Sequence, residues 1–315
     1  MGESIAAVIQ RKRRIKDRLA ERVMGLLTIT AIMLVPLIIA ALFLRAWPIL
    51  AAKPLGELLF STTWRPMKNA FGFYPFIMGT LWVTGLAMII SVPPSLLTAI
   101  YMAEYAPART RSLAKTFIDI LAGIPSVVYG VWGVLTIVPL VRHHLAPTLD
   151  HWLGFIPLFR NDNPTGYGLL AGGLVLAVMV FPIIISLAEE VISAVPQGLR
   201  EASLTLGATR WQTIRRVVMR RAWSGVIAAV TLGFSRAFGE TMAVMMVVGN
   251  VPQVPRSIFD PAYPLTALIA NNYGEMMSIP LYDSALLAGA LILLLIILVF
   301  NITSRLVLVR LIRRE

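Results

Sequence analysis

Two side chains of opposite charge, Arg236 and Glu240, lie near the middle of the apolar stretch GVIAAVTLGFSRAFGETMAVMMVVGN, residues 225–250. A charge at the bilayer centre costs about 2.5–3.5 kcal/mol even on a lenient insertion scale. A guanidinium can grip an oxyanion through two parallel hydrogen bonds, and a nearby carboxylate can pair with it when the site is empty. A structural ion pair is the alternative, but buried pairs seldom stabilise more than apolar packing. The pattern therefore favours an anion site.

Small residues recur every four positions along this stretch and form a ridge on one face of the expected helix. Small side chains let helix backbones approach closely in lipid, so the ridge predicts contact with another helix. Arg236 and Glu240 are also four residues apart and lie beside the ridge, which predicts that both charges face the protein interior or an interface. The members of the ridge are Gly225, Ala229, Gly233, Ala237 and Thr241.

The composition is that of an integral membrane protein. Of 315 residues, 57% are apolar and only 14% are charged, and the mean hydropathy is +0.78. A soluble domain carries about 25% charged residues. The sequence has no cysteine, which excludes disulfides, thiol chemistry and zinc sites built on thiolates. It also has no Gly-Lys dipeptide and hence no Walker A loop, so an energy source must come from a partner.

Six apolar segments are long enough to cross a bilayer, which takes about 20 residues. We expect an all-α membrane protein with a six-helix transmembrane domain over 23–310, preceded by a basic segment over 1–22 that forms an interfacial helix on anionic lipid. The first apolar segment is longer than the roughly 7–15 residues of a cleaved signal, so we interpret it as a retained helix. The expected spans are 23–44, 76–101, 116–141, 168–188, 224–249 and 284–304.

The distribution of Lys and Arg predicts the orientation. Twenty of these residues lie in the N-terminal segment, the second and fourth loops and the C-terminal tail, whereas the alternate loops hold seven. The positive-inside rule then places both termini in the cytoplasm. The net charge of +12 is mostly explained by this topology, so we do not expect nucleic-acid binding.

Prolines interrupt three of the central segments, at Pro93-Pro94, Pro125 and Pro182. Each proline frees a carbonyl that needs another partner, and such positions are tolerated where protein or a water-filled cavity surrounds them. Kinking for packing is the plainer reading of any one proline, but three broken segments favour a substrate path over a passive anchor. The residues that we expect along this path are Arg236, Glu240, Thr241 and Ser126.

The fourth loop, 195–223, contains two expected short helices. The first covers 199–206 and ends at Gly207, which suits a left-handed cap. The second begins after Thr209, because Thr209 and Gln212 have the spacing of a capping box. Two short helices with arginines on the second also resemble a DNA-binding helix-turn-helix. Both ends of the loop are tied to membrane spans, however, so the hairpin is poorly placed to enter a major groove.

Within this loop, Glu201-Ala202-Ser203 followed by Gly207 resembles the EAA loop of ABC importer permeases. The runs RAFGETMAVMMVVGN, GIPSVVYGVWG and NNYGEM are similar to the longer-tailed permease subunit of the phosphate-specific ABC importer. The sequence departs from the family at the end of the loop, where Arg220 stands in place of the usual proline. This departure predicts that the second helix continues toward Trp223.

The resemblance implies a type I ABC importer permease fold in the cytoplasmic (inner) membrane and no enzymatic activity in this subunit. It further implies a heterodimer with a second permease, a dimer of ATPase subunits docked on Glu201, Ala202, Ser203 and Gly207, and an external phosphate-binding protein. The transported anion would be inorganic phosphate, with Arg236 and Glu240 in its path. Another oxyanion such as sulfate, molybdate or phosphonate is the alternative, and an ion-coupled carrier is a more remote one.

A metal or cofactor is not expected. His143, His144 and His151 gather with Asp150 in an extracytoplasmic loop, but imidazoles near lipid headgroups are common. No nucleophile–base arrangement stands out either. The proline-rich segment 250–283 contains the apolar run LTALIANNYGEMM, and Pro264 suits the first turn of a helix there. We expect a short helix at the outer surface, where the binding protein would dock.

Overall fold

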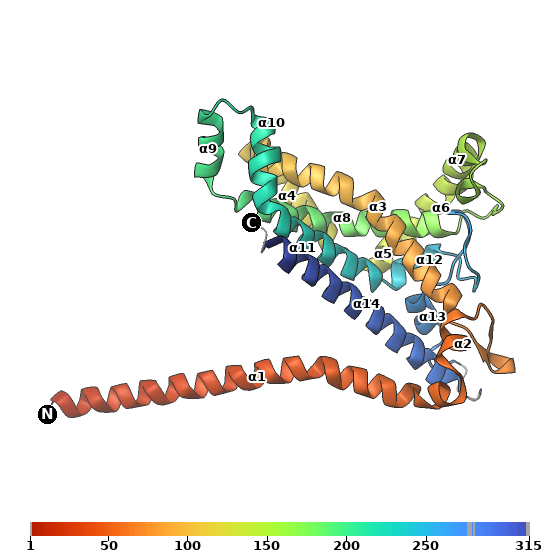
Figure 1. Cartoon of the computed structure of the whole chain (residues 1–315), viewed down its shortest axis with the longest axis horizontal. Helices are drawn as coiled ribbons and strands as arrows, with labels where there is room; N and C mark the ends of the chain where they lie inside the picture. The colour runs from red at the N-terminus through yellow and green to blue at the C-terminus, as the bar shows by residue number, and fades with distance from the viewer. Residues whose placement is uncertain (1, 276–278, 280, 313–315) are drawn as a thin grey trace.

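The computed structural model describes the backbone of residues 2–275, 279 and 281–312, and their side chains except those of 2–15, 307, 308, 311 and 312. Within this part of the chain, six helical segments are long and apolar enough to cross a membrane, as predicted. The N-terminal end, the end of the last helix and a helical hairpin lie at one end of the long helices, and the longer loops lie at the other (Figure 1). These segments are Lys16–Ala52, Tyr74–Glu104, Ser126–Leu153, Leu169–Ser193, Arg210–Phe238 and Tyr282–Leu306.

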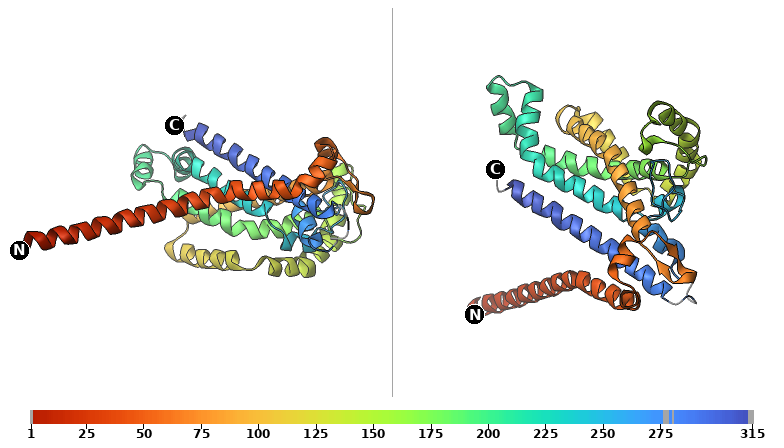
Figure 2. Two further views of the ribbon diagram at one scale, coloured as in Figure 1. Left: turned by 90° about the horizontal axis from the view of Figure 1, so that it is seen from below. Right: turned by 45° about the vertical axis from the view of Figure 1, so that its right-hand side comes forward.

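The first and last long helices pack against each other over only part of their lengths. Helix α1 (Gly2–Ala52) and α14 (Tyr282–Ile312) meet near the C-terminal end of α1, where Ala46 and Ile49 are fully buried. From there α1 diverges from the other helices (Figures 1 and 2). Helix α1 runs through residue 22 without a break, so the basic segment is not a separate helix as we had expected.

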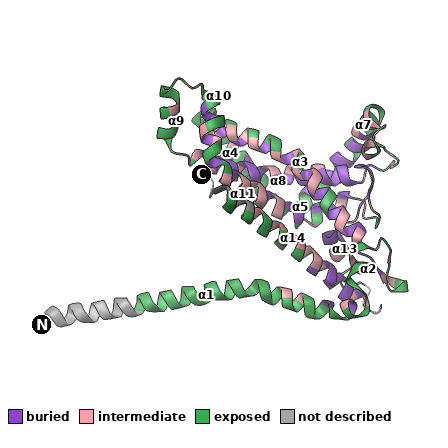
Figure 3. Ribbon diagram, in the orientation of Figure 1, coloured by how far each residue is buried: buried purple, intermediate pink, exposed green. Residues whose placement is uncertain are grey.

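Helix α8 (Leu169–Ser193) forms the centre of the fold and packs along α3 (Tyr74–Glu104) and α11 (Met219–Phe238). Both α3 and α8 continue through their prolines, so two of the three expected interruptions do not break their helices. Burial is concentrated on these helices, while α1 is exposed along most of its described length (Figure 3).

Four of the five residues of the small-residue ridge lie on α11, and this part of the ridge packs against α8, as its spacing predicted; the fifth, Thr241, lies beyond the end of the helix. A Cβ atom added to Gly233 would lie 2.6 Å from Cγ1 of Ile184, and one added to Gly225 would overlap Val191. Ala229 and Ala237 on the same face are buried. Two larger side chains at the glycine positions would therefore push α11 away from α8.

The predicted third span, 116–141, is wrong in its boundaries. Helix α4 (Ala108–Gly123) ends before the extended residues Ile124 and Pro125, and a new helical run begins at Ser126. The residue before a proline is disfavoured in the helical region, which explains the break. The new run reaches Leu153 through α5 (Ser126–Trp132), the π-helix η2 (Gly133–Ile137), α6 (Val138–Leu140), the π-helix η3 (Val141–Leu145) and α7 (Ala146–Leu153).

The predicted fifth span, 224–249, is not one helix. Helix α11 ends at Phe238, residues 239–241 are non-helical, and α12 (Met242–Val247) follows. Glycine lowers helix stability by about 1 kcal/mol relative to alanine, so Gly239 favours a break at this point. At its other end the helix is longer than predicted, because it continues without interruption from α10 (Arg210–Thr213) through the π-helix η5 (Ile214–Val218) into α11.

Short elements complete the described structure. The loops at the other end from the α9–α10 hairpin contain α13 (Leu265–Asn272), which begins directly after Pro264. The expected short helix is therefore present, but its expected position at the surface is wrong for its first half, since residues 265–268 are buried. The hairpin at the opposite end of the long helices is formed by α9 (Gln197–Thr205) and α10 (Figure 1). The remaining elements are α2 (Leu55–Phe60), β1 (Trp64–Arg65), η1 (Pro66–Lys68), β2 (Ala70–Phe71), which pairs antiparallel with β1, and η4 (Pro157–Phe159).

Candidate functional site

Arg236 lies in the last turn of α11, on an exposed face of the chain. Among the described residues, its side chain has no hydrogen bond or ion pair. Its neighbour Ser235 fixes the helix end by donating to Thr231 O at 3.0 Å and to Oδ1 of Asn301 on α14 at 3.1 Å. The guanidinium is therefore held on an anchored helix, with its donors available to an anion or to another subunit.

Glu240 does not pair with Arg236, so the expected pairing of these two residues is wrong. The break after Phe238 removes Glu240 from the helix that carries Arg236. Its carboxylate instead accepts the N–H of Ala243 at 3.3 Å, at the beginning of α12, and its main-chain carbonyl accepts the hydroxyl of Thr266 at 3.0 Å. An acidic side chain is favourable at a helix N-terminus, which supplies a structural reason for a charge at this depth.

Three hydroxyls that the sequence analysis did not single out line a small cavity together with Glu240. They belong to Thr80, Thr84 and Thr266, from α3 and α13. Thr80 and Thr84 are four residues apart and buried in a span whose other buried residues are mostly apolar. This spacing of polar groups on one helix face was the signal that could have revealed them.

The other two expected pathway residues lie at helix starts close to the break. Thr241 directly precedes α12 and donates to Gly239 O at 3.3 Å. Ser126 is the first residue of α5 and is half-buried. Helices α5 and α12 approach closely, because a Cβ atom added to Gly130 would lie 3.2 Å from Cα of Ala243. The structure thus brings the elements of Ser126 and Thr241 together, but shows no hydrogen bond between their side chains within the described region.

The hairpin formed by α9 and α10 has the local geometry that the sequence predicted. Gly207 has a left-handed backbone, with φ of +85°. The capping box is present: the N–H of Gln212 donates to Oγ1 of Thr209 at 3.3 Å, and Oε1 of Gln212 accepts the N–H of Thr209 at 2.9 Å. The hydroxyls of Ser203 and Thr213 lie 2.9 Å apart and join the two helices.

The outer surface of this hairpin is free in the single chain. Glu201, Ala202 and Gly207 are exposed, and Leu206 is 89% exposed. A nine-residue helix with no buried residue, such as α9, is a surface available to a partner. As predicted, the second helix continues past Trp223, since α10, η5 and α11 form one uninterrupted run.

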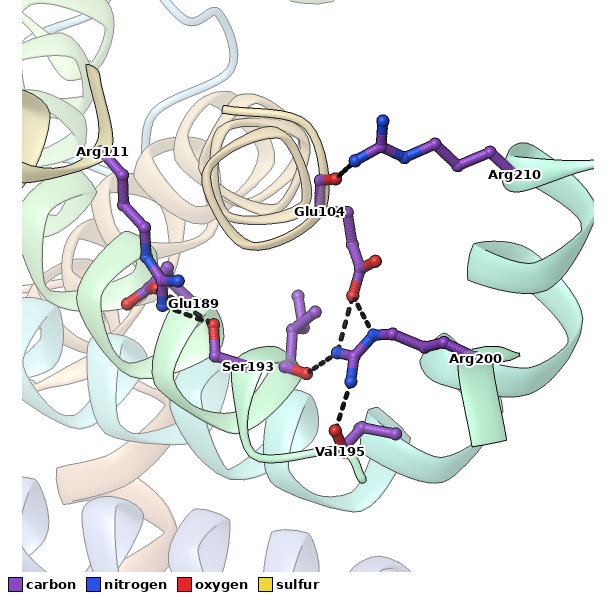
Figure 4. Close-up of polar contacts among 8 residues, drawn as sticks. Glu104, Arg111, Glu189, Ser193, Val195, Arg200 and Arg210 are labelled. Carbon is purple, nitrogen blue, oxygen red and sulfur yellow. Dashed lines mark hydrogen bonds and ion pairs between the residues drawn. The ribbon is translucent and has the colours of Figure 1, made fainter. Parts of the chain in front are cut away.

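Two ion pairs, each with a buried carboxylate, hold this end of the helices together and were not predicted (Figure 4). Arg200 of α9 pairs with Glu104, the last residue of α3, with 2.7 Å between Nη2 and Oε1. Arg111 of α4 pairs with Glu189 of α8 and donates to Ser193 Oγ at 2.7 Å. These pairs join residues that are 78 to 96 positions apart, which no local sequence pattern reveals.

A cavity of about 460 Å³ lies between the hairpin and the ends of α3, α4 and α8. Its walls carry both signs of charge, from Arg111, Arg200 and Arg210 and from Glu104 and Glu201. With three arginines and two glutamates the lining carries a small net positive charge, and Arg200 is already paired with Glu104. In the part of the chain that the structure describes, no group of three His, Asp or Glu residues is placed to hold a metal ion.

Comparison with known proteins defines the class of the chain. Residues 95–313 match the family described as binding-protein-dependent transport system inner membrane component. The chain belongs to this family. Its predicted fold, an all-α membrane protein with six transmembrane helices of the ABC importer permease type, is confirmed.

Curated relatives give the comparison more detail. The phosphate transport system permease protein PstC of Pasteurella multocida is 40% identical over 260 residues, covering 82% of this chain and 81% of its own. PstC of Haemophilus influenzae is 36% identical over 297 residues, 93% of each chain. The probable ABC transporter permease protein YqgH of Bacillus subtilis is 36% identical over 298 residues, 92% of this chain and 91% of its own. These relatives confirm the resemblance inferred from the sequence motifs.

Solved structures share the fold at low sequence identity. A chain of the MetNI methionine ABC transporter, in an inward-facing conformation, aligns with a TM-score of 0.55 and 19% identity, covering 79% of this chain and 99% of its own. A chain of a bacterial alginate ABC transporter aligns with a TM-score of 0.51 and 17% identity, covering 88% and 92%. This similarity concerns the arrangement of the helices alone.

Proposed function

We propose that the chain is the permease subunit of an ATP-driven importer that moves inorganic phosphate from an external binding protein into the cytoplasm. The observation that carries the anion path is the exposed guanidinium of Arg236, at the end of an anchored helix and without a partner among the described residues. Phosphate as the substrate is supported by the PstC relatives, whose names state that they belong to phosphate transport systems.

The proposed assembly is a heterodimer with a second permease, placed against the uncovered face that carries Arg236 and against the exposed length of α1. A dimer of ATPase subunits would dock on α9, around Glu201, Ala202, Ser203 and Gly207. The external binding protein would dock at the opposite end, near α13. Both termini would then lie in the cytoplasm, at the same end of the long helices as the α9–α10 hairpin (Figure 1).

Alternating access is the proposed mechanism. ATP binding in the partner moves α9, and the uninterrupted run α10–η5–α11 carries this movement to Arg236. At about 1.5 Å per residue, the 29 residues from Arg210 to Phe238 span roughly 43 Å. The break at 239–241 lets α11 and α12 move relative to each other, so Arg236 can face either side while Glu240 remains attached to α12.

Uptake of labelled phosphate tests this proposal. Cells that lack their own importer would carry the full complex with wild-type, Arg236→Gln or Arg221→Gln chains. Arg221 is the matched control, because it is an exposed arginine at the other end of the same helix. We expect uptake by the wild type and the control, in the presence of excess sulfate and molybdate, and loss of uptake with Arg236→Gln in an assembled complex.

Three outcomes would contradict the proposal, each in a different way. Uptake suppressed by sulfate or molybdate would change the substrate to another oxyanion and leave the permease function intact. Normal uptake by the Arg236→Gln complex would remove Arg236 from the path. Failure of this variant to assemble would instead assign Arg236 a structural role at the interface between the permeases.

A further inference from the structure

A single carboxylate at the end of α3 joins that helix to the α9–α10 hairpin. Oε1 of Glu104 accepts Nε of Arg200 at 3.1 Å and Nη2 at 2.7 Å. The side chains of Arg200 and Glu104 are only 14% and 8% exposed, so water screens this pair weakly. Two donors of one guanidinium on one oxygen fix the direction of the contact as well as its length.

The same guanidinium also reaches the end of α8. Nη2 of Arg200 donates to Ile192 O at 2.9 Å, and Nη1 donates to Val195 O (Figure 4). These carbonyls belong to the last turn of α8 and the residues just beyond it, where a cation is favourable for a helix C-terminus. Arg200 therefore connects α9 to α3 and α8 at once.

The second helix of the hairpin is tied to the same residue of α3. Arg210, the first residue of α10, donates to the main-chain carbonyl of Glu104. Its guanidinium also lies over the ring of Tyr105, with 4.6 Å between Cζ and the ring centroid. Both helices of the hairpin are thus attached to one point at the end of α3.

Polar contacts hold α9 in place, because apolar burial is lacking. The helix has nine residues, of which none is buried, and its Leu199 and Leu204 are exposed, as is Leu206 just beyond its end. An isolated helix of this length is unstable in water. Apart from the Ser203–Thr213 hydroxyl contact within the hairpin, the side-chain hydrogen bonds of α9 with other elements in the described part of the chain come from Arg200.

We propose that Glu104 and Arg200 are positioning residues through which movement of α9 is passed to α3 and α8. This inference rests on the proposed function, in which an ATPase displaces α9. With the pair intact, the ends of α3 and α8 move with α9 while α10 and α11 carry Arg236. Without it, α9 keeps its chain connections to α8, through residues 194–196, and to α10, and its packing on α10 and η5, but loses its direct tie to α3. ATP hydrolysis then proceeds without a matching movement of α3.

The experiment compares phosphate uptake and ATP hydrolysis by the complete transporter in the same proteoliposomes. The variants are Glu104→Gln and Arg200→Lys, and the control is Glu57→Gln, which removes the exposed Lys53–Glu57 pair at the other end of the molecule. The free energy of one charged hydrogen bond corresponds to a factor of about ten in an equilibrium. Its loss should therefore raise the amount of ATP hydrolysed per phosphate transported about tenfold. We expect this rise in both variants and no change in the control.

Three results would overturn the inference. One is a fall of uptake and hydrolysis together at an unchanged ratio, which would assign the pair to stability alone. Another is an assembled Arg200→Lys complex that hydrolyses as much ATP per phosphate transported as wild type, because this variant retains the charge but loses the two-donor geometry. The third is failure of both variants to assemble, with the control intact, which would also show that the pair is purely structural.

A distance measurement separates this inference from the identity of the substrate. The sequence has no cysteine, so spin labels can be attached at Gly198→Cys on α9 and Leu97→Cys on α3, both exposed. In wild type we expect the same label-to-label distance without nucleotide and with trapped ATP, because the two helices move together. In Glu104→Gln the distance should differ between the two states. If the label-to-label distance in wild type changes between the two states, α3 and α9 do not move together and the inference is contradicted. This result does not depend on whether the transported anion is phosphate.

Discussion

The glycine ridge between α11 and α8 makes a quantitative prediction about packing. Gly233→Ala places a methyl group 2.6 Å from Cγ1 and 2.9 Å from Cδ1 of Ile184, closer than side chains tolerate. Overpacking of this kind costs about 1–3 kcal/mol. Replacing a helical glycine by alanine also gains about 0.4–1 kcal/mol. The balance predicts a net destabilisation of about 1 kcal/mol for Gly233→Ala.

The sign of this effect should reverse when the opposing side chain is shortened. Ile184→Ala alone should cost about 2–5 kcal/mol, because it opens a cavity in the core. In that background Gly233→Ala no longer meets Cγ1 and Cδ1, and the one tight contact left is with Cγ1 of Val180 at 3.2 Å, so the gain in helix stability outweighs the remaining strain. The coupling between the two substitutions should therefore be about 2 kcal/mol, within the range seen for residues in contact.

Equilibrium unfolding of the purified full chain in mixed micelles measures these differences. Gly85→Ala is the matched control, since Gly85 lies in the membrane-spanning helix α3 with nothing within 4 Å of an added Cβ atom. It should leave the free energy of unfolding unchanged or slightly raise it. If Gly233→Ala behaves like Gly85→Ala, or if the Ile184→Ala background leaves its effect unaltered, the close packing of the ridge on α8 is refuted.

Three further predictions concern the hairpin and the break after α11. Thr209→Ala removes the capping box and should destabilise the start of α10 by about 1 kcal/mol, which faster amide hydrogen exchange at Thr213 would report. Gly207→Ala should cost about 1–2 kcal/mol through strain of the left-handed backbone alone, because an added Cβ atom meets nothing within 4 Å. The same amide hydrogen exchange measurement tests this, and an unchanged exchange rate would contradict the strain. Glu240→Gln keeps an acceptor for the Ala243 N–H, so the unfolding midpoint should stay near wild type, whereas Glu240→Ala should lower it.

Much of the fold follows from patterns that are local in the sequence. Hydropathy alone places the six spans, because the cost of unpaired backbone in lipid leaves few alternatives to helices. The capping box at Thr209 and the left-handed Gly207 were predictable since each depends on residues within one turn. The four-residue ridge was predictable because helix periodicity decides which side chains share a face.

The errors arise where local patterns compete or where distant residues decide. Hydropathy is continuous across Pro125 and across Gly239, so it predicted single spans where backbone preferences break the helix. The pairing of Arg236 with Glu240 failed for the same reason, as it presumed an unbroken helix. Arg200 and Glu104 are 96 positions apart along the chain. Their contact depends on how α3 and α8 end, and no spacing in the sequence encodes it.

The contact between α1 and α14 determines the order in which the protein can be completed during synthesis. Ala46 and Ile49 are buried with Tyr282 and Leu286, which follow more than 230 residues later in the chain. At translation rates of about 5–20 residues per second, α1 waits roughly 10–50 s for this neighbour. Its membrane-spanning window is apolar and unburied, so lipid alone solvates it during this interval. The N-terminal helix thus inserts as an independent unit, and the apolar cluster that contains Ala46, Ile49, Tyr282 and Leu286 closes only when the last helix has entered the membrane.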